Sequence, residues 1–371
     1  MAEVLLVEPF MGGSHQAWAE GLVAHSRHHI RLATHPDRFW RWRLRGAAVT
    51  LAAQIRELLA DGWRPEVMVV SDMVDVAGLL GHLRRELGQV PVVVYFHENQ
   101  LLYPDGPSRR TDQAPAWINW TSMLAADQVV FNSEFHRSAW FDALPGLLAS
   151  APDQDHTGFA DRVRSCARVI PVGVDTAVLI DATRAEAART ATSGGGPIRV
   201  IWNQRWDHDK DPAGVLSALI RWTERGADLA IGLAGERHSD PAADFGWAFD
   251  ALGGRLVDLG HLGRPEYRRA LLSSDVMLSM ATHEFFGISI VEAAAAGVVP
   301  VLPDRLSHPE LMGEWAEHTL YGEGDLDTHL DRIAADLRTQ RSSLHGLRSS
   351  MRRFDWAQVI DRYDHLIDEV R

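Results

Sequence analysis

The chain has 371 residues, 46% of them hydrophobic, and a formal net charge of -13. It is long enough for two substantial cores, so two domains are expected, and its acidic balance argues against indiscriminate nucleic-acid binding. No run of about 18 apolar residues indicates a membrane span or signal peptide, and the lone Cys166 excludes an intrachain disulfide, so a cytoplasmic protein is expected.

The first predicted strand, Val4–Val7, leads through Gly12 and Gly13 into a helix that ends near Ser26. Two glycines let the backbone approach a ligand closely, and Ser14, which His15 follows, is a suitable N-cap. The full dinucleotide fingerprint is absent, so nicotinamide binding is not predicted. A plain tight turn is the alternative interpretation.

A basic segment follows, with seven arginines and one acid between Arg27 and Arg56. It contains Arg38 and the alternating run Phe39-Trp40-Arg41-Trp42-Arg43. Aromatic and guanidinium groups in alternation could stack on unpaired bases and contact phosphates. The alternative is a set of half-buried tryptophans with their arginines in water.

The rest of the first half alternates strands with helices, which predicts a parallel, doubly wound sheet. Strands are expected at Val67–Ser71, Val92–Phe96 and Gln128–Phe131, and helices at Val49–Ala60, Val76–Leu87, Ala116–Ala126 and Phe135–Leu147. Ligands of such sheets collect beyond the carboxyl ends of the strands. Three polar clusters fall there: Gly12–His15, His97-Glu98-Asn99-Gln100 and Asn132-Ser133-Glu134.

His97 directly follows an apolar strand, so its side chain could exchange a hydrogen bond with a substrate hydroxyl near neutral pH. The alternative is that it ties down the loop that begins at Glu98. Because other polar clusters are also predicted at the strand ends, the substrate role of His97 is favoured.

A domain boundary is expected near Gly173, and the alanine- and glycine-rich segment Ala182–Pro197 is expected to be a flexible surface loop. Beyond it the strand-helix alternation resumes. Strands are expected at Ile198–Trp202, Leu229–Leu233, Leu256–Leu259, Val276–Ser279 and Val298–Leu302, and a last helix at Trp356–Val370.

Arg205 and Lys210 flank the loop after the first strand of this half. Lys210 is the only lysine among 37 basic residues, which suggests a site where arginine would not serve, such as a phosphate contact. Together the two cations could clamp a diphosphate. The aspartates at 207, 209 and 211 leave a salt-bridged turn or a divalent-cation site as alternatives.

The segment Thr282–Glu292 combines a polar loop with the start of a helix, after the strand near Val276. A phosphate settles at such a place because the first helical turn presents unpaired N–H groups. Glu284 is expected beside a ligand in the loop and Glu292, eight positions later, in the helix. A charge among apolar neighbours needs a partner, and a hydroxyl-rich ligand is one. An ordinary strand-helix corner is the alternative.

The pattern of Arg205 with Lys210 and of Glu284 with Glu292 resembles that of retaining glycosyltransferases of the GT-B fold, family 4. Six blocks are more specifically similar to the tRNA-queuosine α-mannosyltransferase family: Glu8–His15, Trp40–Arg43, Phe96–Leu101, Phe131–Ser133, Arg205–Pro212 and His283–Gly287. They occur in the same order along the chain. A chance match to all six is improbable.

The resemblance implies an α/β fold of two doubly wound Rossmann-like domains that face each other across a cleft. Residues 1–172 would form an N-terminal acceptor-side domain, residues 173–350 a nucleotide-sugar-binding domain, and residues 351–371 a helix returning to the first domain. The donor would be GDP-mannose, the acceptor the cyclopentenediol of queuosine in a tRNA anticodon, and no metal or other cofactor is expected. Neither a membrane nor a protein partner is implied.

The family pattern also implies residue roles. Arg205 and Lys210 would hold the diphosphate, Glu284 the donor sugar, Glu292 the ribose, and His97 would lie near the reacting sugar. Retention without a carboxylate nucleophile implies a front-face displacement, in which the leaving phosphate helps deprotonate the acceptor hydroxyl. The further donor-side residues would be Gly12, Gly13, Phe285, Phe286, Gly287 and Ile288; the acceptor and RNA side would use Ser14, His15, Arg38, Trp40, Arg41, Trp42, Arg43, Glu98, Asn99 and Asn132.

Gln16 departs from the pattern, because relatives often carry a basic residue after Gly-Gly-Ser-His. Two other functions fit parts of the sequence. One is a glycosyltransferase with another nucleotide sugar and a small-molecule or lipid acceptor, for which Trp40 and Trp42 would be core or membrane-facing. The other is a catalytically silent nucleotide-sugar or RNA-binding protein.

Overall fold

A computed structural model describes residues 1–103, 112–153, 155–187, 196–237, 241–337, 339 and 344–371. The chain divides into two compact units, the N-unit (Met1–Gly173 with Trp356–Arg371) and the C-unit (Val174–Asp355). The boundaries expected from the sequence, 172/173 and 350/351, lie near the observed ones at 173/174 and 355/356.

The N-unit contains a six-stranded sheet in the order β2-β1-β3-β4-β5-β6, and every neighbouring pair of strands is parallel. Its strands are β1 Glu3–Met11, β2 His29–Pro36, β3 Val67–Ser71, β4 Val92–Phe96, β5 Gln128–Phe131 and β6 Ala167–Val169. Its helices are α1 Gly13–His25, α2 Trp40–Leu59, α3 Val76–Leu87, α4 Ala114–Ala125, α5 Glu134–Leu148, α6 Thr157–Ser165 and α17 Trp356–Val370.

The helices of the N-unit fall into two groups. Helices α2, α3, α4, α5 and α6 form a chain of contacts with one another, whereas α1 contacts α17. The reversal of strand order at β1 explains this division, because right-handed crossovers to opposite sides of β1 place their helices on opposite faces of the sheet. β3 and β4 are buried along their whole length, as expected for central strands covered on both faces.

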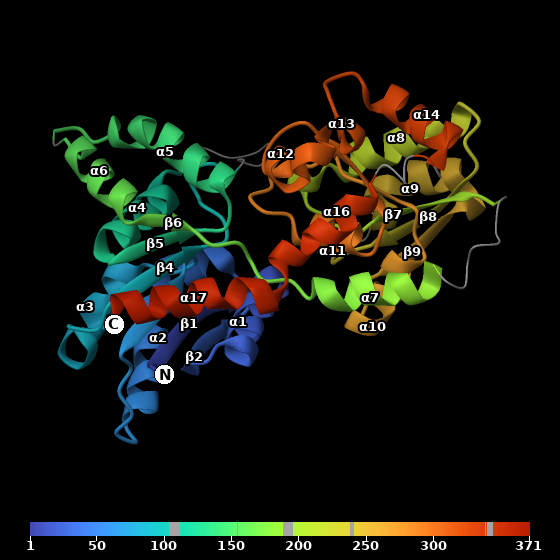
Figure 1. Ribbon diagram of the computed structural model, residues 1–371. Coiled ribbons are helices and arrows are strands. Elements are labelled where there is room, and N and C mark those ends of the chain that lie inside the picture. Colours follow the sequence, from blue (N-terminus) through green and yellow to red (C-terminus); the bar gives the residue numbers. More distant parts are fainter. Residues whose placement is uncertain (104–111, 154, 188–195, 238–240, 338, 340–343) are drawn as a thin grey trace. The chain divides into compact units, whose positions relative to one another are not determined.

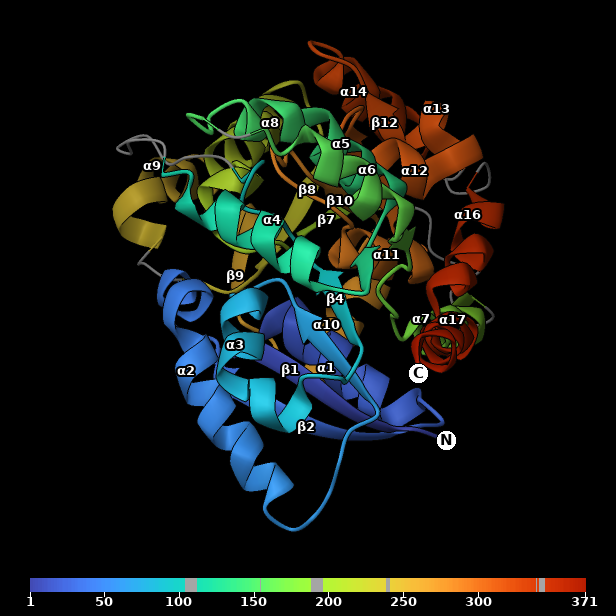
Figure 2. The same ribbon diagram turned by 90° about the vertical axis from the view of Figure 1, so that its left-hand side faces the viewer.

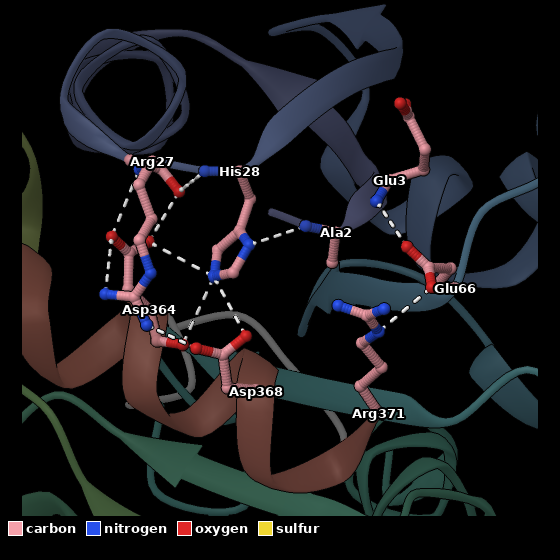
Figure 3. A network of polar contacts seen from close by, with 9 residues as sticks. Ala2, Glu3, Arg27, His28, Glu66, Asp364, Asp368 and Arg371 are labelled. Carbon is pink, nitrogen blue, oxygen red and sulfur yellow. Dashed lines mark hydrogen bonds and ion pairs between the residues drawn. The ribbon is translucent and has the colours of Figure 1, made fainter.

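The last helix, α17, is held in the N-unit by polar contacts with the chain's beginning (Figures 1 and 3). The buried Asp364 carboxylate accepts hydrogen bonds from the Ser26 hydroxyl and, at 3.1 Å, from the Arg27 amide. His28 Nδ1 accepts a hydrogen bond from the Ala2 amide at 2.9 Å, so its Nε2 carries the proton that faces α17. These contacts secure a helix that lies more than 180 residues from the rest of its unit in sequence.

The C-unit repeats the architecture with a six-stranded sheet in the order β12-β11-β10-β7-β8-β9 (Figure 2). Its strands are β7 Ile198–Trp202, β8 Leu229–Ala234, β9 Leu256–Gly260, β10 Val276–Leu278, β11 Val299–Pro303 and β12 Leu320–Tyr321. Its helices are α7 Thr176–Ala187, α8 Pro212–Glu224, α9 Pro241–Leu252, α10 Arg264–Leu272, α11 Ile288–Ala295, α12 His308–Met312, α13 Ala316–Thr319, α14 Leu326–Ala335 and α16 His345–Ser350, with short 3₁₀ turns at His208–Lys210, Gly253–Arg255, Gly313–Trp315 and Met351–Phe354.

The predicted alternation of strands and helices is confirmed, with some differences. Strand β2 was missed because Ala33 is its only buried residue, so its hydrophobic pattern is weak. The loop expected at Ala182–Pro197 is wrong for residues 182–187, which belong to helix α7, and residues 188–195 lie outside the described residues. Ser14 is not the N-cap of α1; Gly12 takes that position. No helix among the described residues is long and apolar enough to span a bilayer.

Candidate active-site residues

A buried cluster of acids and histidines lies at the carboxyl ends of the N-unit strands. Glu8 comes from β1 and is 0% exposed, and His15 comes from the first turn of α1. His15 Nδ1 donates to Glu8 Oε2 at 3.1 Å. Burial alone would lower the pKa of His15, but the Glu8 carboxylate outweighs it and raises this pKa to about 9. His15 is therefore protonated at neutral pH.

His97 lies beside this ion pair, as the strand-end pattern predicted. Its ring centroid is 4.2 Å from that of His15 and 4.8 Å from that of Trp18. Burial and the neighbouring His15 hold the pKa of His97 well below its ordinary value, so the imidazole is neutral. Its Nε2 is buried and has no hydrogen-bond partner among the described residues. A neutral imidazole with one unpaired nitrogen can bind a sugar hydroxyl.

Asp72, at the end of β3, was missed by sequence reasoning. Its Oδ1 accepts a hydrogen bond from the His97 amide at 2.9 Å, and the residue is 0% exposed. Burial raises the pKa of Asp72 to about 8, so this carboxyl is protonated at neutral pH. Its position directly after an apolar strand was the available signal, because it matches that of His97 one strand along.

Several predicted acceptor residues have structural partners instead of open surroundings. Asn132 Nδ2 donates to the His97 carbonyl at 2.8 Å, while its Oδ1 meets His136 Nδ1 at 2.8 Å. Asn99 Oδ1 accepts from the Leu102 amide, and Glu98 accepts from the Gln100 side chain. These contacts fix the loop after β4, so they position His97.

The two glycines before α1 differ from each other. A Cβ on Gly12 would lie 2.2 Å from an Asp37 carboxylate oxygen, so the space left by this glycine is filled by an acid. Gly13 has a φ of 52° and open space around its Cα, and Ser14 beside it is exposed. A ligand phosphate at this turn remains a prediction, and Gly13 is the residue that has room for it.

Glu8, His15 and His97 together offer three possible metal-ligand atoms that all lie within 4.8 Å of one another. Carboxylate and imidazole are a donor set that suits zinc. The observed contact between His15 and Glu8 is also a complete ion pair by itself. A metal-free site therefore stays a prediction, which a chelator can test.

The basic segment Arg27–Arg56 is less cationic than its composition suggests. Arg27, Arg31, Arg45 and Arg56 pair with Asp368, Asp61, Asp112 and Glu86 respectively. The other three arginines, Arg38, Arg41 and Arg43, cluster at the start of α2. Three of the segment's seven arginines thus lie beside Trp40 and Trp42 in the chain.

Those tryptophans are not core residues, which was one alternative for them. Trp42 is 64% exposed and Phe39 is 75% exposed, while Trp40 is half-buried. Phe39 has a φ of 57°, a left-handed conformation that is costly for a bulky residue. The Arg41 guanidinium carbon lies 4.9 Å from the Trp40 ring centroid. An exposed aromatic and basic surface is therefore present at the start of α2.

In the C-unit, Lys210 reaches the loop that precedes α11. Its Nζ donates to the His283 carbonyl at 2.7 Å and to Glu284 Oε2 at 3.1 Å, and it lies 3.2 Å from Asp209 Oδ2. Burial would lower the pKa of Lys210, but Glu284 and Asp209 raise it. Burial likewise opposes the ionisation of Glu284, yet Lys210 lowers its pKa. Both groups are charged at neutral pH.

Arg205 forms an ion pair with Asp207 at 3.0 Å within its own loop. This is the contact that the salt-bridged-turn alternative predicts. The Arg205 side chain is still 47% exposed, so it can also meet a ligand. Lys210 contacts the Glu284 loop directly, and Arg205 is close enough to act electrostatically on Lys210 and His283.

Glu292 has a protein partner that sequence reasoning missed. The Arg264 guanidinium donates to Glu292 Oε1 at 2.8 Å, and the Tyr267 hydroxyl donates to Oε2 at 3.0 Å. Asn203 Nδ2 contacts the Tyr267 hydroxyl at 2.8 Å and the Ser289 carbonyl. Burial raises the pKa of Glu292 despite Arg264. The position of Arg264 and Tyr267 in the first turn of α10, after β9, was the signal that could have found them.

The turn before α11 uses its predicted donor residues in different ways. Phe285 and Phe286 are each 4% exposed; their rings pack on His283 and Phe354, so only their backbone could meet a ligand. Gly287 is the N-cap with a φ of 99°, a conformation that favours glycine. Ile288 begins the helix, whose first amides are the ones that a helix leaves unpaired. The turn can therefore present N–H groups to an anion.

Known structures share the fold of the whole chain. Sucrose-phosphate synthase from Thermosynechococcus elongatus has a TM-score of 0.72 at 17% identity, over 100% of this chain and 99% of that one. HepE of Anabaena, solved with UDP-glucose, has a TM-score of 0.69 at 14% identity, over 100% of both chains. With the two parallel sheets, these neighbours confirm the expected GT-B fold.

The sequence comparisons are more specific. Residues 3–174 match a model described as the N-terminal part of tRNA-queuosine alpha-mannosyltransferase. The tRNA-queuosine alpha-mannosyltransferase of Drosophila melanogaster is 30% identical over 99% of this chain and 98% of its own. A GDP-mannose:cellobiosyl-diphosphopolyprenol alpha-mannosyltransferase of Xanthomonas oryzae is 27% identical over 63% of this chain and 62% of its own. The chain therefore belongs to the tRNA-queuosine α-mannosyltransferase family.

Proposed function

We propose that the protein transfers mannose, with retention, from GDP-mannose to the cyclopentenediol of queuosine in the anticodon of a tRNA of the aspartate type. The observation that carries this proposal is the similarity to the Drosophila enzyme along practically the whole of both chains. Such coverage includes both units, so the proposal does not rest on one shared domain.

The C-unit is the proposed donor side. Lys210 and the first amides of α11 would hold the diphosphate, and Arg205 would join them from its exposed position. Glu284, kept ionised by Lys210, would accept hydrogen bonds from donor sugar hydroxyls. Glu292 would accept the ribose hydroxyls while Arg264 and Tyr267 keep it in place. Fixed cations of this kind stabilise the charge that develops on a departing diphosphate.

The N-unit is the proposed acceptor side, where His97 would meet the reacting sugar through its neutral imidazole. In a front-face displacement the acceptor oxygen bonds to the anomeric carbon as the bond to the phosphate oxygen breaks. The acceptor proton passes to the leaving phosphate. The protein then contributes positioning and charge stabilisation, and no metal is required.

The deciding experiment supplies radiolabelled GDP-mannose together with tRNA that contains or lacks queuosine. We expect label only in the queuosine-containing tRNA and, after nuclease digestion, in the modified nucleoside. Label in a lipid extract instead would favour the second candidate, a polyprenol-type acceptor, which the more distant Xanthomonas relative supports. Binding of both substrates with no transfer would indicate a silent binding protein.

A further inference from the structure

The N-unit contains a pocket where two segments that are far apart in sequence meet. One is the start of α2, with Trp40, Arg41 and Arg45; the other is the region after β4, with Gln100 and Tyr103. Asp112 and Pro115 also line the pocket. The Trp40 and Tyr103 ring centroids are 6.2 Å apart, with an interplanar angle of 51°. Both segments lie in blocks that carry the family resemblance or adjoin them.

The pocket combines aromatic faces with hydrogen-bonding groups of both kinds. Trp40 and Tyr103 offer rings, and Arg41 lies over the Trp40 ring. The Asp112 carboxylate is an acceptor, and Arg45, which pairs with it, is a donor. Gln100 is held from both sides, because its amide N–H donates to Asn119 Oδ1 at 2.8 Å and its side chain donates to Glu98 Oε1. A planar heterocycle with donors and acceptors on one edge matches this set.

The pocket lining combines two cations, Arg41 and Arg45, with one acid, Asp112. Asp112 contributes a carboxylate to the lining and partly neutralises Arg45, so a phosphate would meet an acid here. A guanine-type base carries two neighbouring N–H donors beside a carbonyl oxygen. A carboxylate next to a guanidinium complements that edge, because the first accepts from the N–H groups and the second donates to the oxygen.

Two exposed aromatic residues extend this surface. Phe39 holds its strained conformation at the N-cap of α2, and strained residues cluster at ligand sites. The Trp42 ring lies over Gly46, where a Cβ would approach it to 2.8 Å. Bases that flank the one in the pocket could stack on these rings.

We propose that this pocket holds one unpaired guanine-type base of the acceptor RNA, with Trp40 and Tyr103 stacking on the base and Asp112 with Arg45 reading its pairing edge. The inference rests on the proposed function, since queuosine keeps the pairing edge of guanine. It adds to that function a base-binding subsite and its selectivity.

The test measures binding of the full-length protein to an anticodon stem-loop RNA with guanosine at the wobble position, by fluorescence anisotropy at several salt concentrations. Trp40→Ala should weaken binding about tenfold, because it removes stacking. The salt dependence should stay unchanged, because no phosphate contact is lost. Trp247→Ala is the matched control, since Trp247 is 47% exposed in the C-unit and should leave the affinity unchanged.

Two further comparisons identify the contact. An RNA that lacks only the wobble base should bind the wild type and Trp40→Ala with equal affinity. This result would show that the Trp40 ring contributes to binding through that base. Asp112→Asn should reduce the preference for guanosine over adenosine at that position about tenfold.

The outcomes separate this inference from the proposed function. Unchanged affinity of Trp40→Ala, or an equal loss with the abasic RNA, would overturn the pocket while leaving mannose transfer to queuosine intact. A lower salt slope for Trp40→Ala would indicate a phosphate site and would also overturn it. Failure of the proposed function would appear separately, as wild-type protein that transfers mannose to no queuosine-containing RNA.

Discussion

The Lys210 ammonium group lies among three oxygen-bearing neighbours, and this makes it the residue whose replacement is most informative. Lys210→Met would leave the buried Asp209 and the 17% exposed Glu284 without their cation, which costs about 3 kcal/mol of unfolding free energy. It should also lower kcat/KM for mannose transfer by at least about 100-fold, because the diphosphate loses a fixed charge. Urea unfolding and initial rates with GDP-mannose measure the two effects.

The double variant Lys210→Met with Glu284→Gln separates them. It removes the uncompensated charge of Glu284 but leaves the buried Asp209 without Lys210, so we expect it to regain only part of the lost stability. Transfer should stay as low as in the single variant, because neither group can then act on the donor. Recovery of activity together with stability would mean that the pair is only a structural ion pair.

Asp72 gives a pH prediction whose sign follows from its burial. The pKa of Asp72 is about 8 in the folded protein and its ordinary value is 3.8, so the native state keeps a proton that the unfolded state has lost. Stability therefore falls as pH rises from about 4 to 8. Asp72→Asn keeps the shape without the titration, so its unfolding free energy should decline less between pH 5 and pH 8.

The Glu8–His15 pair also makes the protein less stable as pH rises, but over a higher pH range. Because the folded pKa of His15 is raised to about 9, its contribution is complete below about pH 6.5 and is lost as pH rises through 9. Some slope above pH 6.5 should thus persist in Asp72→Asn. Asp361→Asn, an exposed change on α17, is the control. An unaltered slope in Asp72→Asn would show that Asp72 is ionised in the native state.

The residue scale also shows what the sequence could and could not indicate. The contact of Lys210 with the Glu284 loop follows from strand-end placement, because parallel strands bring their carboxyl ends to one edge. The partners of Glu292 could not be predicted in this way. A buried carboxylate implies that a partner exists but does not identify it. Arg264 and Tyr267 come from a different helix, and pairing across elements depends on register that one sequence does not encode.

Helix α17 depends on two glycines that lie far from it in the chain. A Cβ on Gly21 in α1, or on Gly173 at the end of the N-unit segment, would lie 2.2 Å from the Trp356 ring. That ring is 4% exposed and stacks on His25 with an interplanar angle of 4°. The Trp356 ring therefore packs directly on the backbone at Gly21 and Gly173, and this packing holds the start of α17 in place.

Gly21→Ala should therefore destabilise the protein by about 2 kcal/mol, because an added methyl forces the packed ring to move. Gly81→Ala is the matched control. Gly81 lies in helix α3, and no atom lies within 4 Å of the position that an added methyl would take, so this change should stabilise by about 0.5 to 1 kcal/mol. Urea unfolding of both variants checks the prediction, and equal effects of the two would contradict the packing role of Trp356.

At the scale of elements, the strength of the periodic signal decided which predictions held. β3 and β4 are fully buried and apolar apart from Ser71, and their predicted bounds are the observed ones. β2 carries Arg31 and two histidines in a partly exposed strand at the sheet edge, where packing imposes no regular pattern. The end of α7 is rich in alanine, and three glycines follow it at 194–196. The whole segment therefore has the composition of a loop, although its first part is helical.

At the scale of the whole molecule, the proposed division of labour predicts where a donor product acts. GDP with a chelator present should raise the thermal midpoint of the full chain, because a ligand that binds only the folded state stabilises it by about 2.7 kcal/mol at 100 times its Kd. Hydrogen exchange should slow in segments around Lys210 and from His283 to Glu292, whereas the β3 and β4 segments of the N-unit should be unaffected. Lys210→Met should abolish most of the midpoint shift. A shift that appears only when magnesium or zinc is added would contradict metal-free binding and would favour a cation, either at the aspartates near Lys210 or at Glu8, His15 and His97.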